Sequence, residues 1–142
     1  MYVHCCGIII FHKDLTIVVK TQGNRYSFPK GKREKKEDLI KCAYRELNEE
    51  TGLLSSDIKL LDGYFDELNI KHTCVSVRYY IGILNEQKNL SFIDPEELDE
   101  VMYKNIEDVL KMHDSNLKPR RKEILQEAYE LYKKYLDENK NI

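Results

Sequence analysis

Apolar and β-branched residues dominate the first part of the chain in two runs, over residues 3–11 and 15–20. Runs of this length and composition are typical of buried β-strands. Residues 12–14 predict a turn between them, and residues 22–24 predict another before a short strand over residues 25–28. Further along, residues 58–68 and 70–84 predict two longer strands, joined as a hairpin around residues 68–70. A polar surface loop is expected over residues 85–89.

Helical spacing of apolar residues marks the middle of the chain. A helix that begins at Glu37 or Asp38 and ends at Gly52, with the glycine in the left-handed conformation, fits this pattern. Its packing stripe is predicted to consist of Ile40, Ala43 and Leu47, flanked by Cys42 and Tyr44. The carboxylates of this segment lie outside that stripe, so the sequence predicts separate core and chemistry faces on one helix.

The last third of the chain predicts two further helices. A short one begins at Asn105 or Asp108 and continues through Met112. A longer one has Pro119 in its first turn, where a missing amide hydrogen costs nothing, and reaches about residue 136. Its packing stripe, which is expected to cover the core, consists of Leu125, Ala128, Tyr132 and Tyr135.

The composition fits one globular domain. The chain has 142 residues, 42% hydrophobic and 34% charged, which suffices for a sizeable core. We therefore predict a single domain over residues 1–138 and a polar tail over residues 139–142. The net charge of −2 gives no overall basic field that would attract nucleic acid. No apolar run approaches the roughly 20 residues that span a bilayer, so no membrane partner is expected.

The cysteines and the beginning of the chain predict a cytoplasmic protein. Two of the 4 cysteines are adjacent, unlike the disulfide framework of a secreted domain. The apolar run at the start has no basic segment before it, so it predicts a strand and not a signal peptide. His4 and Cys6 share one face of that strand, with Cys5 on the other. Their spacing matches no standard zinc pattern, which favours core packing.

Three carboxylates lie close together on the central helix. Glu46, Glu49 and Glu50 stand at i, i+3 and i+4, which places them on one helix face. Like charges at this spacing repel, and a divalent cation would compensate them. Oxygen ligands suit a hard cation such as Mg²⁺ or Mn²⁺. Residues 29–32 predict a loop nearby, where Gly31 lets the backbone approach a ligand closely.

These residues fit the pattern G-x5-E-x7-R-E-U-x-E-E-x-G-U, in which U is aliphatic. The chain therefore resembles the Nudix box, the signature of hydrolases that cleave nucleoside diphosphates linked to another group. The resemblance implies an α/β fold, a Nudix-like α/β/α sandwich with a mixed sheet, a central catalytic helix and a C-terminal helix. Periodicity alone predicts only strands with a central and a C-terminal helix. The positions that match the pattern are Gly31, Glu37, Arg45, Glu46, Leu47, Glu49, Glu50, Gly52 and Leu53.

The resemblance also implies how the box residues divide the chemistry. Glu49 and Glu50, with Glu46 and the main-chain carbonyl of Lys30, would hold Mg²⁺ or Mn²⁺. Arg45 would orient the site by pairing with Glu37 or with a helix carboxylate. Gly31, Glu37 and Gly52 would serve the structure of the box.

A second element lies at residues 97–103. Glu97, Leu98, Val101 and Tyr103 resemble a Nudix element in which an acidic residue precedes an aliphatic and an aromatic residue. In several relatives of that kind the acid is an extra metal ligand or the general base. The resemblance thus implies either Glu46 or Glu97 as the base that activates water.

Basic residues near the box are candidates for binding phosphate. Lys30, Lys32 and Arg25, with the backbone of Gly31, are the principal ones, and Lys20 and Arg33 are others. Aromatic residues on the later strands are candidates for stacking on a nucleobase, although aromatic residues on strands more often pack in the core. These candidates are Tyr64, Phe65, His72 and Tyr80.

The implied activity is a Mg²⁺-dependent pyrophosphohydrolase. Residues 28–32 resemble the corresponding loop of mRNA-decapping enzymes and, less closely, of diadenosine polyphosphate hydrolases. The expected substrates are therefore a capped RNA or a dinucleoside polyphosphate. A diphosphoinositol polyphosphate phosphohydrolase and a non-catalytic Nudix module that binds RNA or another ligand are the alternatives. Because every box carboxylate is present, catalysis is favoured over a binding role. The protein is expected to be a monomer or a homodimer.

Overall fold

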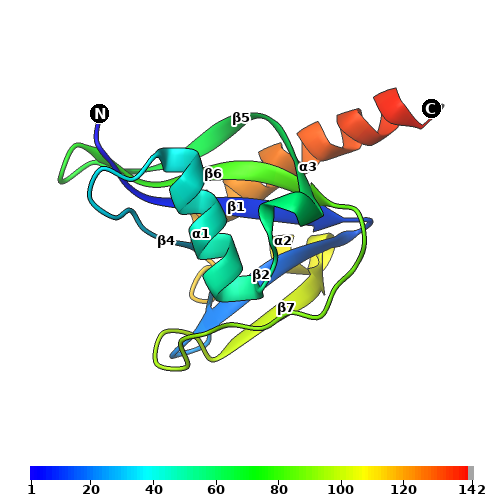
Figure 1. Cartoon of the computed structure of the whole chain (residues 1–142). Coiled ribbons are helices and arrows are strands. Elements are labelled where there is room, and N and C mark those ends of the chain that lie inside the picture. The colour runs from blue at the N-terminus through cyan, green and yellow to red at the C-terminus, as the bar shows by residue number, and fades with distance from the viewer. Residues whose placement is uncertain (141–142) are drawn as a thin grey trace.

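A computed structural model of the chain describes residues 1–140. Two residues of the tail predicted at 139–142 therefore lie outside the described residues. A seven-stranded sheet forms the centre of the molecule, with helices on both sides (Figure 1). The strands are β1 (Val3–His12), β2 (Leu15–Thr21), β3 (Arg25–Ser27), β4 (Lys30–Lys32), β5 (Ile58–Asn69), β6 (Cys74–Leu84) and β7 (Glu100–Asn105). The helices are α1 (Leu39–Thr51), α2 (Ile106–Leu110) and α3 (Pro119–Asn139), with a 3-10 turn, η1 (Ser55–Asp57).

Two strands, β2 and β4, pair with different parts of the same edge of β1. On its other edge, β1 runs parallel to β6, from Val3 opposite Val75 to Phe11 opposite Ile83. On the shared edge, β2 pairs only with its end at residues 11–12, whereas β4 pairs with residues 5–7. The β3-β2-β7 part of the sheet therefore separates from β4, and a cleft opens between them.

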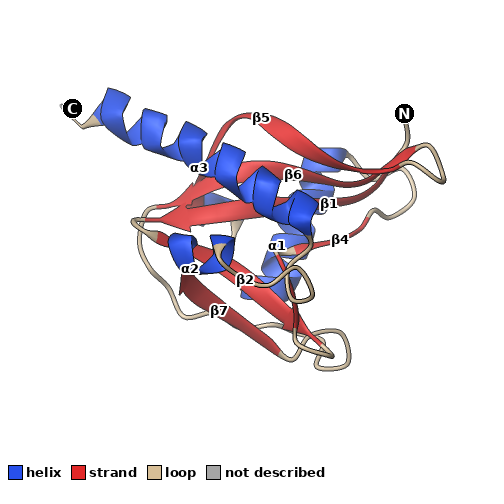
Figure 2. Cartoon of the chain, turned by 180° about the vertical axis from the view of Figure 1, so that it is seen from behind, coloured by secondary structure: helices blue, strands red, loops and turns tan. Residues whose placement is uncertain are grey.

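The helices cover opposite faces of the sheet, and each face has its own hydrophobic core. The predicted α/β/α sandwich with a mixed sheet is thus confirmed. Figure 2 shows α3 lying across the face opposite α1. The core under α1 includes Cys6, Ile8, Ile10, Ala43 and Leu47. The core under α2 and α3 includes Ile9, Phe11, Val109, Ile124, Leu125, Ala128 and Tyr132.

The face that α1 buries differs from the predicted one. Ile40 is 41% exposed, because it stands in the first turn of the helix and points away from the sheet. Cys42 is fully buried instead, and Glu46 and Glu50 follow it on the same side at one-turn intervals, only 6% and 5% exposed. The prediction of separate core and chemistry faces is therefore wrong. The carboxylates border the core directly.

Several strand boundaries also differ from the predictions. Residues 29–32 are not simply a loop, because residues 30–32 pair with β1 as strand β4. The β5–β6 turn spans residues 70–73 and is wider than expected. Strand β7 is not predicted by the sequence pattern. In β1, Cys6 is buried as expected, Cys5 is partly buried, and His4 is exposed where core packing was predicted.

The C-terminal helices follow the sequence closely. Helix α2 has Asn105 as its N-cap, with the side chain accepting a hydrogen bond from the Asp108 amide at 3.3 Å. It ends at Leu110, two residues before the predicted end. Helix α3 begins at Pro119 and reaches Asn139, beyond the predicted residue 136. Among residues 1–140, no helix combines the length and the apolar character that crossing a bilayer requires. All four cysteines are free thiols.

The C-terminal end of α1 is fastened by a loop from far along the chain. Gly52 has a φ of 81°, the left-handed conformation predicted for it, and its amide donates to the Asn48 carbonyl at 2.9 Å. The Ser91 and Ile93 amides donate to the Thr51 and Glu49 carbonyls, both at 3.0 Å. These bonds satisfy carbonyls that a helix end leaves without partners.

Replacing Gly52 tests this junction. A Cβ at Gly52 would lie 2.8 Å from Ser91 Oγ, whereas at Gly23, with a φ of 76°, it would meet nothing within 4 Å. The left-handed conformation alone costs a residue with a Cβ about 1–2 kcal/mol. We expect Gly23→Ala to lose that amount of unfolding free energy and Gly52→Ala to lose more, measured by urea denaturation. The double variant Gly52→Ala/Ser91→Ala should return to the Gly23→Ala level; equal losses for the two single variants would contradict the contact.

Candidate active site

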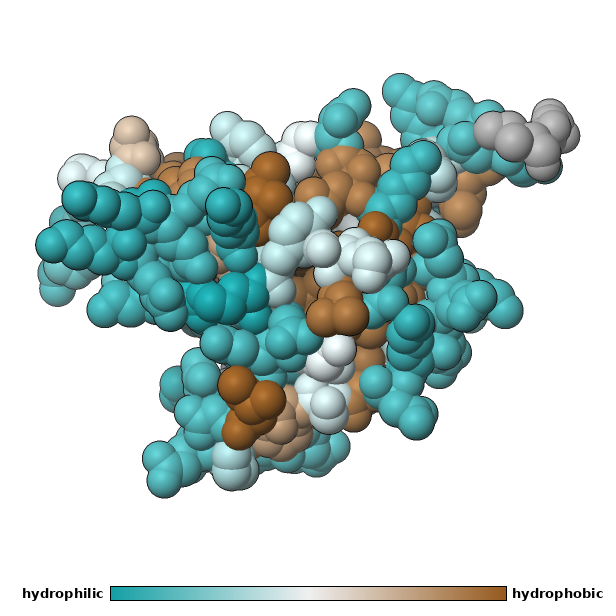
Figure 3. Space-filling model, in the orientation of Figure 1, coloured by the Kyte–Doolittle hydropathy of each residue, from teal (hydrophilic) through white to brown (hydrophobic). Residues whose placement is uncertain are grey.

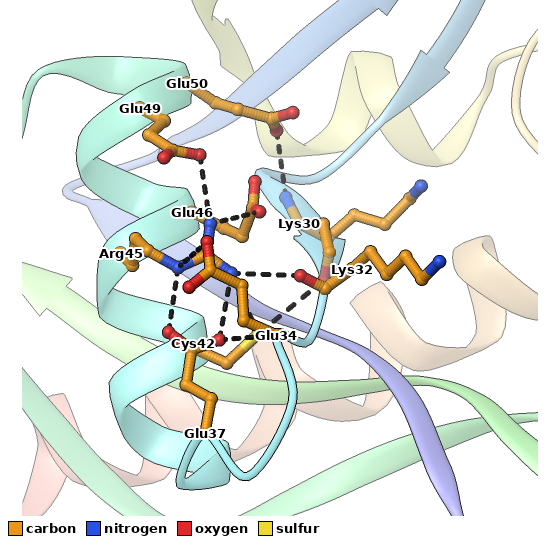
Figure 4. Close-up of polar contacts among 10 residues, drawn as sticks. Lys30, Lys32, Glu34, Glu37, Cys42, Arg45, Glu46, Glu49 and Glu50 are labelled. Atoms are coloured by element: carbon orange, nitrogen blue, oxygen red, sulfur yellow. Dashed lines mark hydrogen bonds and ion pairs between the residues drawn. The ribbon is translucent and has the colours of Figure 1, made fainter.

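The guanidinium of Arg45 connects α1 with the segment that precedes it (Figure 4). Its Nε and Nη2 donate to the two carboxylate oxygens of Glu37 at 2.8 and 2.9 Å. Nη2 also donates to the main-chain carbonyl of Lys32 at 2.9 Å. One side chain on α1 thus fixes both β4 and the connection from β4 to the helix.

The same guanidinium reaches the carboxylates one turn away. Arg45 Nη1 donates to Glu46 Oε1 at 2.8 Å and to Glu49 Oε2 at 3.2 Å. Both pairings considered for Arg45, with Glu37 and with the helix carboxylates, therefore occur together. Charge-assisted bonds to Arg45 hold the pKa of Glu37 well below its ordinary 4.5, at about 2.

The space that a side chain at Gly31 would need is occupied by the carboxylate of Glu46. A Cβ built on Gly31 would lie 2.1 Å from the Glu46 carboxyl carbon. The sequence interpretation assigned this glycine to close approach of a ligand to the backbone. The structure shows instead that the Glu46 carboxylate packs against its Cα. Gly31 therefore allows β4 and α1 to enclose that carboxylate between them.

Glu50 completes the group from the last turn of α1. Its Oε1 accepts a hydrogen bond from the Lys30 amide at 2.9 Å. Burial raises the pKa of the Glu50 carboxyl to about 8 despite this bond, and burial together with Glu49 raises the pKa of Glu46. Two buried carboxylates in such a setting would be stabilised as anions by a cation.

The donor set fits a hard divalent cation. Glu46, Glu49 and Glu50 supply only oxygen ligands, as Mg²⁺ and Mn²⁺ prefer. Across residues 1–140, no three acidic, histidine or cysteine side chains already converge as a metal cage. The reason is visible in Figure 4, where Glu46 and Glu49 turn toward Arg45 while Glu50 turns toward Lys30. Binding a cation would require rotation of the glutamate side chains, with Arg45 still joined to Glu37.

The cleft beside β4 brings further predicted residues to these carboxylates. A hollow of about 240 Å³ is lined by Lys30, Gly31, Lys32, Glu50 and Glu97. Figure 4 shows that the Lys30 and Lys32 side chains point away from α1, in the same direction. Glu97 reaches the hollow from the loop between β6 and β7, and Leu98 beside it is buried. The hollow is also lined by Cys5 of β1, which pairs with Lys32, and by Val19, Thr21 and Ser27 of β2 and β3.

Other predicted residues lie elsewhere. Arg25 does not line this hollow, Lys20 pairs with Glu100 at 3.5 Å, and Arg33 stacks over Tyr2 with its Cζ 4.8 Å from the ring centre. The suggested base-stacking residues do not line the cleft either. Tyr64 packs against Tyr80 and Arg78, Phe65 packs against the core under α3, and His72 is in the β5–β6 turn.

Gly7 is a structural residue outside the box pattern. A Cβ there would lie 2.4 Å from the Pro29 carbonyl oxygen and 2.6 Å from Lys30 Cβ. Gly7 therefore lets β4 approach β1 closely enough for Lys30 to reach Glu50. An isolated glycine within a strand pattern is a known sign of close backbone approach, so the signal was present in the sequence.

Comparisons with known proteins agree with this architecture. A family model of the NUDIX domain matches residues 2–128. Two Saccharomyces cerevisiae proteins, an mRNA-decapping enzyme subunit 2 and an m7GpppN-mRNA hydrolase, are each 31% identical over 112 residues. The match covers 70% of this chain but only 11% of the length of either relative.

Solved structures share the fold at low sequence identity. An Ap4A hydrolase from C. elegans in a binary complex has a TM-score of 0.77 at 18% identity and covers 90% of this chain and 97% of its own. The NUDIX domain of Shewanella oneidensis NrtR, complexed with ADP ribose, has a TM-score of 0.71 at 17% identity, covering 93% and 89%. The chain belongs to the NUDIX domain family. Nudix hydrolases are also among the solved structures that share this fold.

The pairing of Glu37 with Arg45 has a pH signature. The pKa of Glu37 is about 2 in the folded chain and 4.5 as its ordinary value, so the pairing contributes fully above pH 4.5 and is lost as the pH falls toward 2. We expect Glu37→Gln to lower the unfolding free energy by about 1–3 kcal/mol at pH 7, and the deficit to shrink between pH 4.5 and 2. Urea denaturation across this range measures it.

Glu34→Gln is the matched control, because Glu34 is an exposed neighbour whose Oε1 is 3.8 Å from Arg45 Nε. Its effect on the unfolding free energy should stay small at every pH. A deficit in Glu37→Gln that is constant from pH 7 to 2 would exclude the ionised pair as its cause.

Proposed function

We propose that this protein is a Mg²⁺- or Mn²⁺-dependent pyrophosphohydrolase that cleaves a phosphoanhydride bond in a nucleoside-diphosphate-linked substrate. The observation that carries the proposal is the arrangement in the cleft. Buried Glu46 and Glu50 lie on one side of β4, and Lys30 and Lys32 extend from the other. Carboxylates that can hold a cation thus stand next to ammonium groups that can hold phosphate oxygens.

The chain's own residues supply positioning and proton transfer. Lys30 and Lys32 neutralise phosphate oxygens as point charges, while Arg45 keeps β4 and the glutamates in register. Glu46 or Glu97 accepts the proton of the attacking water. A divalent cation held by Glu46, Glu49, Glu50 and the Lys30 carbonyl would neutralise phosphoryl charge and favour ionisation of water.

Capped RNA and dinucleoside polyphosphates are the substrates that we propose first. The names of the relatives support them, since two curated relatives act on capped mRNA and a structural neighbour is an Ap4A hydrolase. The fold similarity to a NUDIX domain complexed with ADP ribose keeps that nucleotide among the compounds to test. We further propose that the protein acts in the cytoplasm.

A substrate panel tests the proposal. The purified chain is incubated with Mg²⁺ or Mn²⁺ and capped RNA, diadenosine tetraphosphate, ADP-ribose, a nucleoside triphosphate or a diphosphoinositol phosphate. We expect metal-dependent release of products from capped RNA or diadenosine tetraphosphate, measured by chromatography. Preferential turnover of the inositol compound would replace the nucleotide substrate, and no turnover of any compound would favour a binding module.

Glu50→Gln is expected to abolish turnover. The change removes a charged metal ligand but preserves its shape and the hydrogen bond from the Lys30 amide. We expect the rate to fall by at least about a hundredfold, as for loss of an essential electrostatic group. Mn²⁺ binding followed by electron paramagnetic resonance should weaken in parallel. Glu107→Gln, an exposed change on α2, is the control, and a Glu50→Gln variant that turns over normally would refute the metal role.

The choice between Glu46 and Glu97 as the base can be made from pH–rate profiles. If Glu97 is the base, Glu97→Gln should remove the acidic limb of the kcat/KM profile, whereas Glu46→Gln should lower the rate without moving that limb. The opposite pattern assigns Glu46. A fully active Glu97→Gln excludes Glu97.

A further inference from the structure

Two hollows meet at the carboxylates. The first is the cleft of about 240 Å³ beside β4. The second, of about 180 Å³, lies between the last turn of α1 and the loop between β6 and β7. It is lined by Glu49, Glu50, Phe92, Ile93, Asp94, Glu97 and Leu98. Both hollows include Glu50, Glu97 and Leu98, so they meet at carboxylates to which the proposed function gives cation binding and proton transfer. Together they reach the roughly 300–1,000 Å³ usual for small-molecule sites.

The two hollows share Glu50, Glu97 and Leu98 but differ in the rest of their lining. The cleft beside β4 offers the ammonium groups of Lys30 and Lys32 with the polar side chains of Thr21 and Ser27, and none of its lining residues is aromatic. The second hollow is lined only by carboxylates and by the apolar side chains of residues 92, 93 and 98. Lys30 and Lys32 favour a phosphate chain in the first hollow, whereas the lining of the second contains no basic side chain to receive one. An uncharged group with a flat apolar surface suits the second.

Phe92, which is half-buried, and Ile93, which is exposed, are held in place as an apolar shelf. Ile93 is 73% exposed, although its amide is tied to the Glu49 carbonyl at 3.0 Å. On the other side of Phe92, the Ser91 amide is tied to the Thr51 carbonyl at the same distance. The shelf is therefore fixed to the turn of α1 that carries Glu49 and Glu50. Figure 3 shows hydrophobic atoms interrupting a hydrophilic surface below α1, where this loop passes (compare Figure 1).

We propose that Phe92 and Ile93 determine specificity by receiving a nucleoside on one side of the scissile bond, while Lys30 and Lys32 receive the phosphate chain on the other. This inference rests on the proposed function and adds to it that the site is two-sided. A nucleobase laid on the Phe92 ring and the Ile93 side chain removes apolar surface from water without requiring a specific hydrogen-bonding edge. The shelf therefore favours substrates that carry a nucleoside next to the cleaved bond, with little selection among bases.

The test separates the two sides with two probes. Diadenosine tetraphosphate is the substrate, and inorganic tripolyphosphate, which has no nucleoside, is the competitive inhibitor. In Phe92→Ala and Ile93→Ser we expect KM for diadenosine tetraphosphate to rise about tenfold, kcat to stay within about twofold and the inhibition constant of tripolyphosphate to be unchanged. Lys32→Gln should instead weaken tripolyphosphate inhibition about tenfold.

Ile70→Ser is the matched control for Ile93→Ser. Ile70 is 86% exposed in the β5–β6 turn, away from both hollows, and its replacement should change neither constant. If the wild-type protein turns over diadenosine tetraphosphate and both shelf variants keep its KM, the inference is overturned and the proposed function stays intact. If inhibition by tripolyphosphate weakened in the shelf variants as much as in Lys32→Gln, the inference would also be overturned, because the second hollow would then bind phosphate. Absence of wild-type turnover on every compound would overturn the proposed function itself.

Discussion

The arrangement of the candidate site depends on the five donors of one guanidinium. Arg45 holds both oxygens of Glu37, the Lys32 carbonyl and the carboxylates of Glu46 and Glu49, through bonds of 2.8 to 3.2 Å. A planar fork with several donors can do this, whereas a lysine ammonium at the same position could not match the geometry. Without this group, the glutamates of α1 would repel one another, and the Lys32 carbonyl of β4 would lose its bond to the helix.

Placing these carboxylates at the border of the core has a local cost. Burial opposes ionisation of Glu46 and Glu50, and both pKa values are raised accordingly. The chain accommodates the carboxylates with glycine at the position facing Glu46 and with the Lys30 amide facing Glu50. Local destabilisation of this kind is common where a site is built to bind a charged partner, and the rest of the fold compensates it.

The divided edge of β1 explains why a cleft lies beside the carboxylates. Since β2 and β4 pair with different parts of that edge, a cleft remains between them, and Lys30 and Lys32 face into it. The loop after β6 borders a second hollow at these carboxylates and is fastened by hydrogen bonds to the last carbonyls of α1. Glu97 and the apolar residues 92 and 93 therefore reach the carboxylates through tertiary contacts made far from them in sequence. The resulting site has two lysines in one hollow and the apolar residues 92 and 93 in the other, with Glu50 lining both.

The sequence by itself determined the box and the elements that carry it. The spacing of the glutamates, the left-handed glycine at position 52 and the proline at the start of α3 each act within a few residues, so local rules suffice to predict them. Tertiary structure decided what depends on partners. Only the pairing with β1 turns residues 30–32 into a strand, and only the packing of α1 buries Glu46 and exposes Ile40. The position of the shelf at residues 92–93 likewise follows from hydrogen bonds to a helix that precedes it by a whole hairpin, which no local pattern records.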